Sequence, residues 1–288
     1  MLLALSALWG ASFMFIKVGV RDFEPATLVW LRLTVAAVTL APIALLSAGR
    51  SVLAEVRAEW RGLTVLGAAN SVIPFWFLSW GETRIDSGLA AIIQASAPIF
   101  TALLAWRFSR SEQVSGARLA GVLIGFAGVA LLVGGQRGGA ALGALAVLVT
   151  AFFYAAAGLW GGRRMGHVRP LTLAFGTMAT GSLVTLPFGL AQLPADLPGW
   201  KPAVSVLALG VGGSALAYLL YFAILVGAGA SRAILVTYLV PAAALAYGVT
   251  LLGEPLEATA LGGLALVLTG VALGTGALRL TRRGSLRA

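Results

Sequence analysis

The 288-residue chain is too apolar for a soluble globular protein, because 59% of its residues are apolar, only 10% are charged, and the mean hydropathy is +0.96. Soluble domains carry about 25% charged residues. The net charge of +10 does not indicate a nucleic-acid partner, since Lys and Arg are spread over loops without interleaved aromatic residues. The chain has no Cys, and its single His, His167, lies in a charged loop, so we expect no metal site and no cofactor.

Ten apolar segments, separated by charged or turn-rich breaks, are each long enough to cross a bilayer as a helix, which takes about 20 residues. The first half of the chain contains predicted spans near residues 2–20, 25–46, 61–81, 87–106 and 116–134. The second half contains predicted spans near 140–160, 170–192, 201–225, 231–252 and 258–277. The sequence therefore predicts an all-α membrane protein of ten transmembrane helices in a lipid bilayer, without a separate soluble domain.

Basic residues are distributed unequally between the two sides of this predicted bundle. The side of the N-terminus holds Arg50, Arg57, Arg61, Arg107, Arg110, Arg118, Arg163, Arg164, Arg169, Arg232, Arg279, Arg282, Arg283 and Arg287. The opposite side holds Lys17, Arg21, Arg84, Arg137 and Lys201. Because basic loops stay in the cytoplasm, fourteen positions against five predict cytoplasmic N- and C-termini.

The two halves of the chain are similar to each other. Residues 121–131 read GVLIGFAGVAL and residues 263–273 read GLALVLTGVAL, and a proline precedes an acidic loop residue at a similar distance in both halves. These matches predict a duplication, with repeats at 1–135 and 136–288. Since five spans is an odd number, the second repeat crosses the membrane in the opposite sense, and a substrate site is expected near the midplane between the repeats.

A substrate site within lipid should appear as polar or aromatic residues along one face of a helix. Such stripes are Asn70, Ile73, Phe77 and Trp80 in the third span, Ser87, Gln94, Pro98 and Thr101 in the fourth, and Ser214, Tyr218 and Tyr221 in the eighth. We expect Asn70, Gln94, Tyr154, Tyr218 and Tyr221 to converge on one central cavity. The alternatives are helix–helix hydrogen bonds for the two amides and interfacial anchoring for the tryptophans.

Other residues are predicted to act as hinges, as scaffold or as anchors. Pro98 and Pro241 lie at matching mid-span positions and are candidate hinges, with static kinks as the alternative. The glycines of the fifth and tenth spans fit close helix packing: Gly121, Gly125, Gly128, Gly270 and Gly274. Arg32 and Lys17 are expected to snorkel outward, the alternative being attraction of an anionic substrate group.

Acidic residues are absent from the depth of the predicted spans. All ten lie in loops or within a turn or two of span ends. Since intramembrane proteases and hydrolases need paired Asp, or His and Glu, at depth, this pattern argues against an enzyme. It also predicts a facilitator or exchanger, because a proton-coupled carrier needs a titratable group where the substrate is occluded.

Several runs together resemble the EamA type of the drug/metabolite transporter superfamily. They are LWGASF from Leu8, LRL from Leu31, SGLAA from Ser87, GASRA from Gly229 leading to YLVP from Tyr238, and LGEPL from Leu252. The resemblance covers nearly the whole chain and implies two inverted five-helix EamA repeats around a central cavity. The chain departs from the family pattern at Ser111-Glu112, where a Gly-Glu pair is usual, and at Val240, where many members have an acid.

The resemblance implies a transporter of the bacterial cytoplasmic (inner) membrane that exports amino acids, aromatic or apolar ones among them, or similar metabolites by alternating access. A small-molecule substrate is the expected partner, and no oligomer is required. The candidate substrate-binding residues are Trp9, Asn70, Phe77, Trp80, Gln94, Tyr154, Tyr218, Tyr221 and Tyr238. The alternatives are a drug or nucleobase carrier, and, from another class, a membrane enzyme or a non-transporting receptor.

Overall fold

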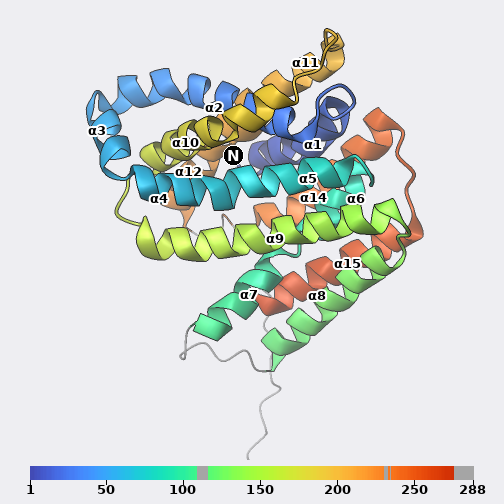
Figure 1. Cartoon of the computed structure of the whole chain (residues 1–288). Coiled ribbons are helices and arrows are strands. Elements are labelled where there is room, and N and C mark those ends of the chain that lie inside the picture. Colours follow the sequence, from blue (N-terminus) through green and yellow to red (C-terminus); the bar gives the residue numbers. More distant parts are fainter. Residues whose placement is uncertain (109–115, 230–232, 234, 276–288) are drawn as a thin grey trace, which may run out of the picture.

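The computed structural model describes residues 1–108, 116–229, 233 and 235–275, and over these residues the chain is a bundle of helices (Figure 1). Eight helical segments are long and apolar enough to cross a membrane, and two shorter apolar ones, Val236–Leu252 and Ala258–Gly274, follow them in the described residues. The predicted ten-helix all-α membrane fold is thereby confirmed. The predicted positions Arg110, Glu112, Arg232, Arg279, Arg282, Arg283 and Arg287, and the start of the ninth span at 231, lie outside the described residues.

The first five spans follow the predicted order. They are α1 (Leu2–Gly19), α2 (Pro25–Ala48), the composite α4 (Trp60–Gly67), η1 (Ala68–Val72) and α5 (Ile73–Glu82), the broken pair α6 (Ser87–Gln94) and α7 (Ala97–Phe108), and α8 (Ala117–Gly134). The last five are α9 (Gly139–Arg164), α10 (Pro170–Ala191), the composite α11 (Trp200–Leu207), η2 (Ala208–Leu216) and α12 (Ala217–Ala228), then α14 (Val236–Tyr247) with η3 (Gly248–Leu252), and α15 (Ala258–Gly274).

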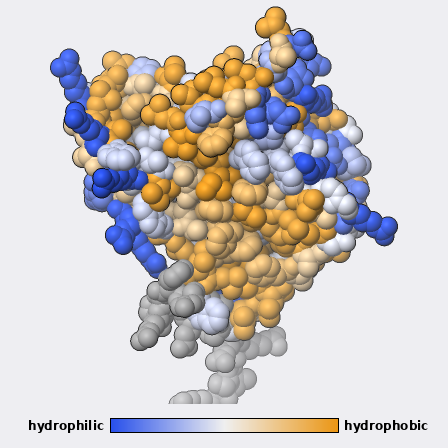
Figure 2. Space-filling view, in the orientation of Figure 1, coloured by the Kyte–Doolittle hydropathy of each residue, from blue (hydrophilic) through white to orange (hydrophobic). Residues whose placement is uncertain are grey.

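The surface is apolar in a band between two hydrophilic margins, as expected for a chain that faces lipid (Figure 2). Large aliphatic side chains such as Leu46, Leu183 and Val226 are between 70% and 88% exposed. In water such exposure would be costly, but lipid tails are as apolar as these side chains.

A short helix that the sequence did not predict, α3 (Ser51–Ala58), connects the second and third spans. Its Glu55 accepts hydrogen bonds from Arg169 Nε, at 2.8 Å, and from the Thr172 hydroxyl. Partial burial acts to raise the pKa of Glu55. The hydrogen bonds outweigh it, and the pKa lies below its usual value of 4.5. The contact ties α3 to the start of α10.

The fifth and tenth spans pack closely, as their glycines predict. Helices α8 and α15 lie side by side (Figure 1). A Cβ atom added to Gly270 would lie 2.4 Å from the backbone nitrogen of Gly125 and 2.7 Å from the carbonyl oxygen of Gly121. Only glycine permits this approach between the two backbones.

The third and eighth spans share a feature at equivalent positions of the two halves, because each contains a π-helical segment, η1 and η2. A π-helix closes hydrogen bonds from i to i+5 and is frequently found at functional sites. Such a segment also shifts the helical phase, so residues before and after it do not share one continuous face. The predicted stripes along these spans assumed a regular α-helix.

The two candidate hinge prolines occupy different settings, which corrects the prediction of matching breaks. The fourth span is interrupted between Gln94 and Ala97, and Pro98 is the second residue of the new helix α7. Pro241 lies inside α14, which continues past it. Proline in the first turn of a helix costs no internal hydrogen bond. The fourth span is therefore broken before Pro98, and α7 is not kinked at Pro98 itself.

The two parts of the fourth span pack against different helices at the two ends of the bundle. The end that carries Lys17, Glu82, Ser87 and Glu254 is called the Lys17 end, and the opposite one the N-terminal end. At the Lys17 end, α6 packs against α1, α5, α9 and α14. Toward the N-terminal end, α7 packs mainly against α8, α9 and α15. Since α6 belongs to the first five spans and α9 and α14 to the last five, the two halves are in contact, and in this sense closed, at the Lys17 end.

Candidate functional site

A buried arginine lies in the second span, about two turns from the start of the helix. Arg32 in α2 is 4% exposed, donates from Nε to the Ser214 hydroxyl at 2.9 Å, and places its guanidinium carbon 3.7 Å from the Phe75 ring centroid. Within the described part of the chain, no carboxylate forms an ion pair with it. The prediction that Arg32 snorkels outward is wrong, because its side chain is enclosed by neighbouring helices.

Glycines of η2 make room for this arginine. A Cβ atom on Gly210 would meet the Val35 side chain at 2.4 Å, and one on Gly213 would meet the Ser12 hydroxyl at 2.3 Å. The bare backbone of η2 therefore lies directly against α1 and α2. This close approach brings Ser214 within hydrogen-bonding distance of Arg32.

Polar side chains from three further spans gather beside Arg32. Asn70 in η1 donates from Nδ2 to the Tyr218 hydroxyl at 2.7 Å. Tyr154 in α9 and Tyr218 in α12 both lie within electrostatic range of the guanidinium. We call Arg32, Asn70, Tyr154, Ser214 and Tyr218 the Arg32 site.

Aromatic rings cover this site on the side of α1 and α12. The Trp9 ring centroid lies 6.4 Å from that of Tyr218, in an edge-on arrangement, and 5.6 Å from that of Tyr221. Phe222 contacts both tyrosines, with centroids 6.2 and 5.6 Å away. Five of the predicted substrate-binding residues are thus brought together, namely Trp9, Asn70, Tyr154, Tyr218 and Tyr221.

Three other predicted residues lie elsewhere. Phe77 lines a surface pocket of about 430 Å³ with Trp76, between the third span and parts of α2 and α10. Trp80 stacks on Trp76 at 6.4 Å and carries the Arg84 guanidinium 3.6 Å above its ring. Tyr238 shares a hydrogen bond with Thr275 at 3.3 Å, beyond the end of α15.

The physical reason for the first two misplacements is the π-helical segment η1. Asn70 lies within η1, whereas Phe77 and Trp80 lie in the α-helix α5 that follows it, so the stripe that would join them in a regular helix is broken. Gln94 is the last residue of α6, and its Oε1 atom is buried without a hydrogen-bond partner. No hydrogen bond links it to the Arg32 site in the described residues.

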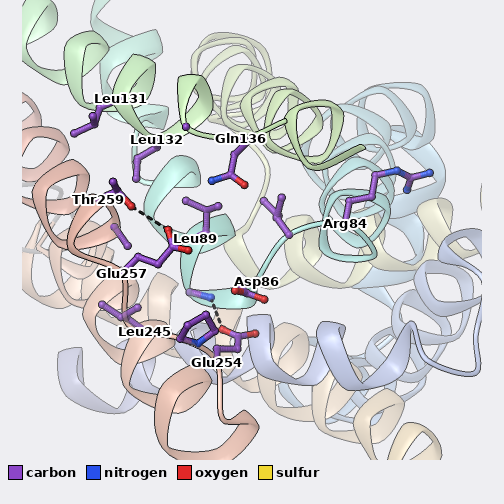
Figure 3. A pocket seen from close by; sticks show the side chains of 15 residues that line it. Arg84, Asp86, Leu89, Leu131, Leu132, Gln136, Leu245, Glu254, Glu257 and Thr259 are labelled. Carbon is purple, nitrogen blue, oxygen red and sulfur yellow. Dashed lines mark hydrogen bonds between the residues drawn. The ribbon is translucent and has the colours of Figure 1, made fainter. Parts of the chain in front are cut away.

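A second polar cluster occupies the Lys17 end (Figure 3). Lys17 donates to the carbonyl oxygens of Glu82 and Ile85, both at 2.8 Å, at the end of α5. Glu254 accepts from the Ser87 amide at 2.8 Å, the Ser87 hydroxyl at 2.9 Å and the Gly88 amide at 3.1 Å. A cation at a helix C-terminus and an anion at a helix N-terminus both complement the helix dipole.

These two contacts border a cavity of about 210 Å³, which is lined by Arg84, Asp86, Gln136, Glu254, Glu257 and Thr259 among others. Burial, and after it the charge of Glu254, raises the pKa of Asp86, while Lys17 opposes the shift. Within the described ranges, no three His, Asp or Glu side chains gather in a way that could hold a metal ion.

Ten spans in two halves, with a buried polar site between them, define the architecture of a secondary transporter. The model of the EamA-like transporter family matches residues 1–134 and 141–275, and the chain therefore belongs to this family. It is a multi-pass membrane transporter and not an enzyme.

Individual relatives match along almost their whole length. An uncharacterized transporter of Archaeoglobus fulgidus is 30% identical over 91% of this chain and 93% of its own. A probable terminal-alkyne amino-acid exporter of Streptantibioticus cattleyicolor is 29% identical over 92% of this chain and 89% of its own. A solved crystal structure shares the fold at a TM-score of 0.68 and 20% identity, with 96% of each chain covered.

Proposed function

We propose that this transporter exports an amino acid, or a similar small metabolite with a carboxylate group, across the bacterial cytoplasmic membrane by alternating access. The observation that carries this proposal is Arg32, a buried cation that has Glu82 within electrostatic range but forms no ion pair with any carboxylate in the described structure. The name of the Streptantibioticus relative, an amino-acid exporter, supports the same substrate class.

The chemistry of the Arg32 site fits a zwitterion. A buried charge left unpaired costs several kcal/mol, and a carboxylate bound to a guanidinium by two parallel hydrogen bonds offsets this cost. The rings of Trp9 and Tyr221 offer faces that attract an ammonium group or pack against an apolar side chain. A nucleobase has no carboxylate, and a cationic drug would be repelled by Arg32.

The distribution of basic residues supports an orientation in which the site is reached from the cytoplasm. In the described loops, Arg50, Arg57, Arg163, Arg164 and Arg169 all lie at the N-terminal end, which supports a cytoplasmic location for that end. Closure at the Lys17 end then corresponds to a state closed toward the outside. In this state the Arg32 site would receive substrate from the cytoplasm.

The test is counterflow in proteoliposomes. Purified protein is loaded with one unlabelled amino acid, and uptake of the labelled compound is compared with uptake of its amide and of the matching amine. We expect transport of the acid and loss of transport for both analogues. Equal transport of the amine would instead support a drug carrier and overturn the proposal.

A second arm changes the protein. Charge-assisted hydrogen bonds contribute about 1.5–3 kcal/mol, so Arg32→Gln should raise the half-saturating concentration by about 10- to 150-fold. Arg32→Lys keeps the charge but loses the two parallel hydrogen bonds of the guanidinium. Its half-saturating concentration should therefore lie between those of the parent protein and of Arg32→Gln. Arg84→Gln is the matched control, because Arg84 is exposed and covers Trp80 outside the site.

A further inference from the structure

A fully buried carboxyl group lies beneath the closed Lys17 end. Glu82 is the last residue of α5 and is 0% exposed. Among the described residues, neither of its carboxylate oxygens has a hydrogen-bond partner. The acid was expected at a span end, in contact with water, and it is instead covered by the helices that meet there.

The charged groups around Glu82 come from three other segments. They are Lys17 in α1, Arg32 in α2, and Glu254 in the segment between η3 and α15. Lys17 does not neutralise the carboxyl by direct pairing, because its ammonium donates to two backbone carbonyls, and the described residues show no Lys17–Glu82 ion pair. Glu254 differs sharply from Glu82, since it accepts three hydrogen bonds.

We propose that Glu82 is a proton-binding site, occupied when the Lys17 end closes and emptied when that end opens to water. The proton comes from water at the Lys17 end and forms an O–H bond with one carboxylate oxygen. It returns to water when opening exposes the carboxyl again. The proposal rests on the alternating access argued above, but it does not depend on the identity of the substrate.

In the described structure, no group donates a hydrogen bond to the Glu82 carboxyl. A carboxylate buried without hydrogen bonds costs far more than a neutral carboxyl group in the same place. Closing the Lys17 end removes water from Glu82, and neither Lys17 nor any other described residue replaces it as a donor. A proton removes this cost without further ligands, whereas a metal ion would need several oxygen ligands, and no such group of acidic side chains gathers in the part of the chain that the structure describes.

The inference replaces the expectation that the chain lacks a titratable group for coupling. Because the closed state binds one proton more than the open state, lowering the pH shifts the equilibrium toward the closed state. The ratio of closed to open molecules should change by up to about tenfold per pH unit.

The absence of Cys allows a direct test with single cysteines. Ala91 is 1% exposed and lies three residues beyond Gly88, whose Cα faces Leu245 of α14. Ala91→Cys should therefore react with a charged, impermeant thiol reagent only when α6 and α14 separate. Thr83→Cys, at an exposed position of the same end, corrects for the pH dependence of the thiol itself.

In protein with Glu82 intact, the reaction rate at Ala91→Cys, divided by that at Thr83→Cys, should fall as the pH is lowered from about 9 to about 5, by up to about tenfold per unit. Glu82→Gln carries a neutral side chain of the same shape. It should react slowly at every pH.

The matched control is Glu257→Gln, which removes an exposed carboxylate at the same end and should keep the full pH dependence. Asp86→Asn tests whether a second acid causes the pH dependence, since the pKa of Asp86 is raised by burial and by Glu254. A pH dependence that survives Glu82→Gln, that is abolished by Asp86→Asn, or that is absent with Glu82 intact would each overturn the proposal. Loss of the Arg32-dependent substrate preference would leave this test unchanged, so the two proposals fail separately.

Discussion

The bond between Glu254 and the start of α6 should hold the Lys17 end closed, and its strength can be worked out from the structure. Glu254 accepts three hydrogen bonds from Ser87 and Gly88. Because the residue is partly exposed, water replaces some of them, and loss of a helix N-terminal acceptor costs about 0.5–2 kcal/mol. Taking about 2 kcal/mol, Glu254→Ala should shift the ratio of open to closed molecules about 30-fold toward open.

The assay is the reaction rate of Ala91→Cys at neutral pH, with and without Glu254→Ala. A second, independent perturbation is Gly248→Ala, since its Cβ would lie 2.3 Å from Glu254 Oε2 and push the carboxylate away from Ser87. Glu257→Ala is the control, because the side chain of this exposed residue bonds only to the nearby Thr259 among the hydrogen bonds of the described residues. Equal rates in the Glu254→Ala and Glu257→Ala proteins would refute the reasoning.

Two further predictions concern stability. Gly270→Ala should lower the free energy of unfolding by about 1–3 kcal/mol, because the added Cβ would lie 2.4 Å from the backbone of Gly125. Gly262→Ala in the same helix is the control and should be nearly neutral, since its Cβ would meet only a side chain at 3.8 Å. Thermal unfolding in detergent compares the two variants, and equal melting temperatures would contradict the close packing of α8 and α15. The hydrogen bonds that lower the pKa of Glu55 stabilise the fold above the unfolded-state pKa and lose this contribution as the pH falls through the folded-state pKa. Glu55→Gln should therefore lose less stability on acidification below about pH 4.5 than the parent protein, measured as melting temperature against pH, and parallel curves would count against this role.

The spans could be predicted from the sequence because lipid imposes one simple requirement, a run of about 20 apolar residues. The Gly270–Gly125 contact was predictable for a similar reason, since small residues at matching positions of two apolar helices have few other uses. Amphipathic α3 escaped prediction because its eight residues are too short and too polar to resemble a span.

The position of side chains around a helix was predictable only where the helix is regular. Trp9 and Tyr221, both candidate substrate-binding residues, lie against each other, and α1 and α12 are ordinary α-helices on either side of the contact. Phe77 and Trp80 do not join Asn70, because Asn70 lies in the π-helical segment η1 and the helical phase changes where η1 passes into α5. The sequence AANSV of η1 carries no signal that distinguishes a π-helix from an α-helix.

Burial of charged residues was the least predictable property. Lys17, Arg32 and Glu82 all lie within two turns of a span end, where single-helix reasoning places them in contact with water. Their surroundings depend on which other helices cover them, and that is a tertiary property. Arg32 is enclosed because Gly210 and Gly213 let η2 approach α2, a contact between residues almost 180 positions apart.

The hydrogen bonds at the Arg32 site indicate why substrate binding and alternating access would use the same residues. Arg32 and Asn70 belong to the first five spans, whereas their partners Ser214 and Tyr218 belong to the last five. Any rocking of one half against the other must therefore break or rearrange these two bonds. A neutral hydrogen bond contributes about 0.5–1.5 kcal/mol and one to a charged group about 1.5–3, so their sum is comparable to the few kcal/mol that separate two conformations of a protein. A carboxylate that engages Arg32 more strongly in one conformation than in the other has enough binding energy to shift that balance.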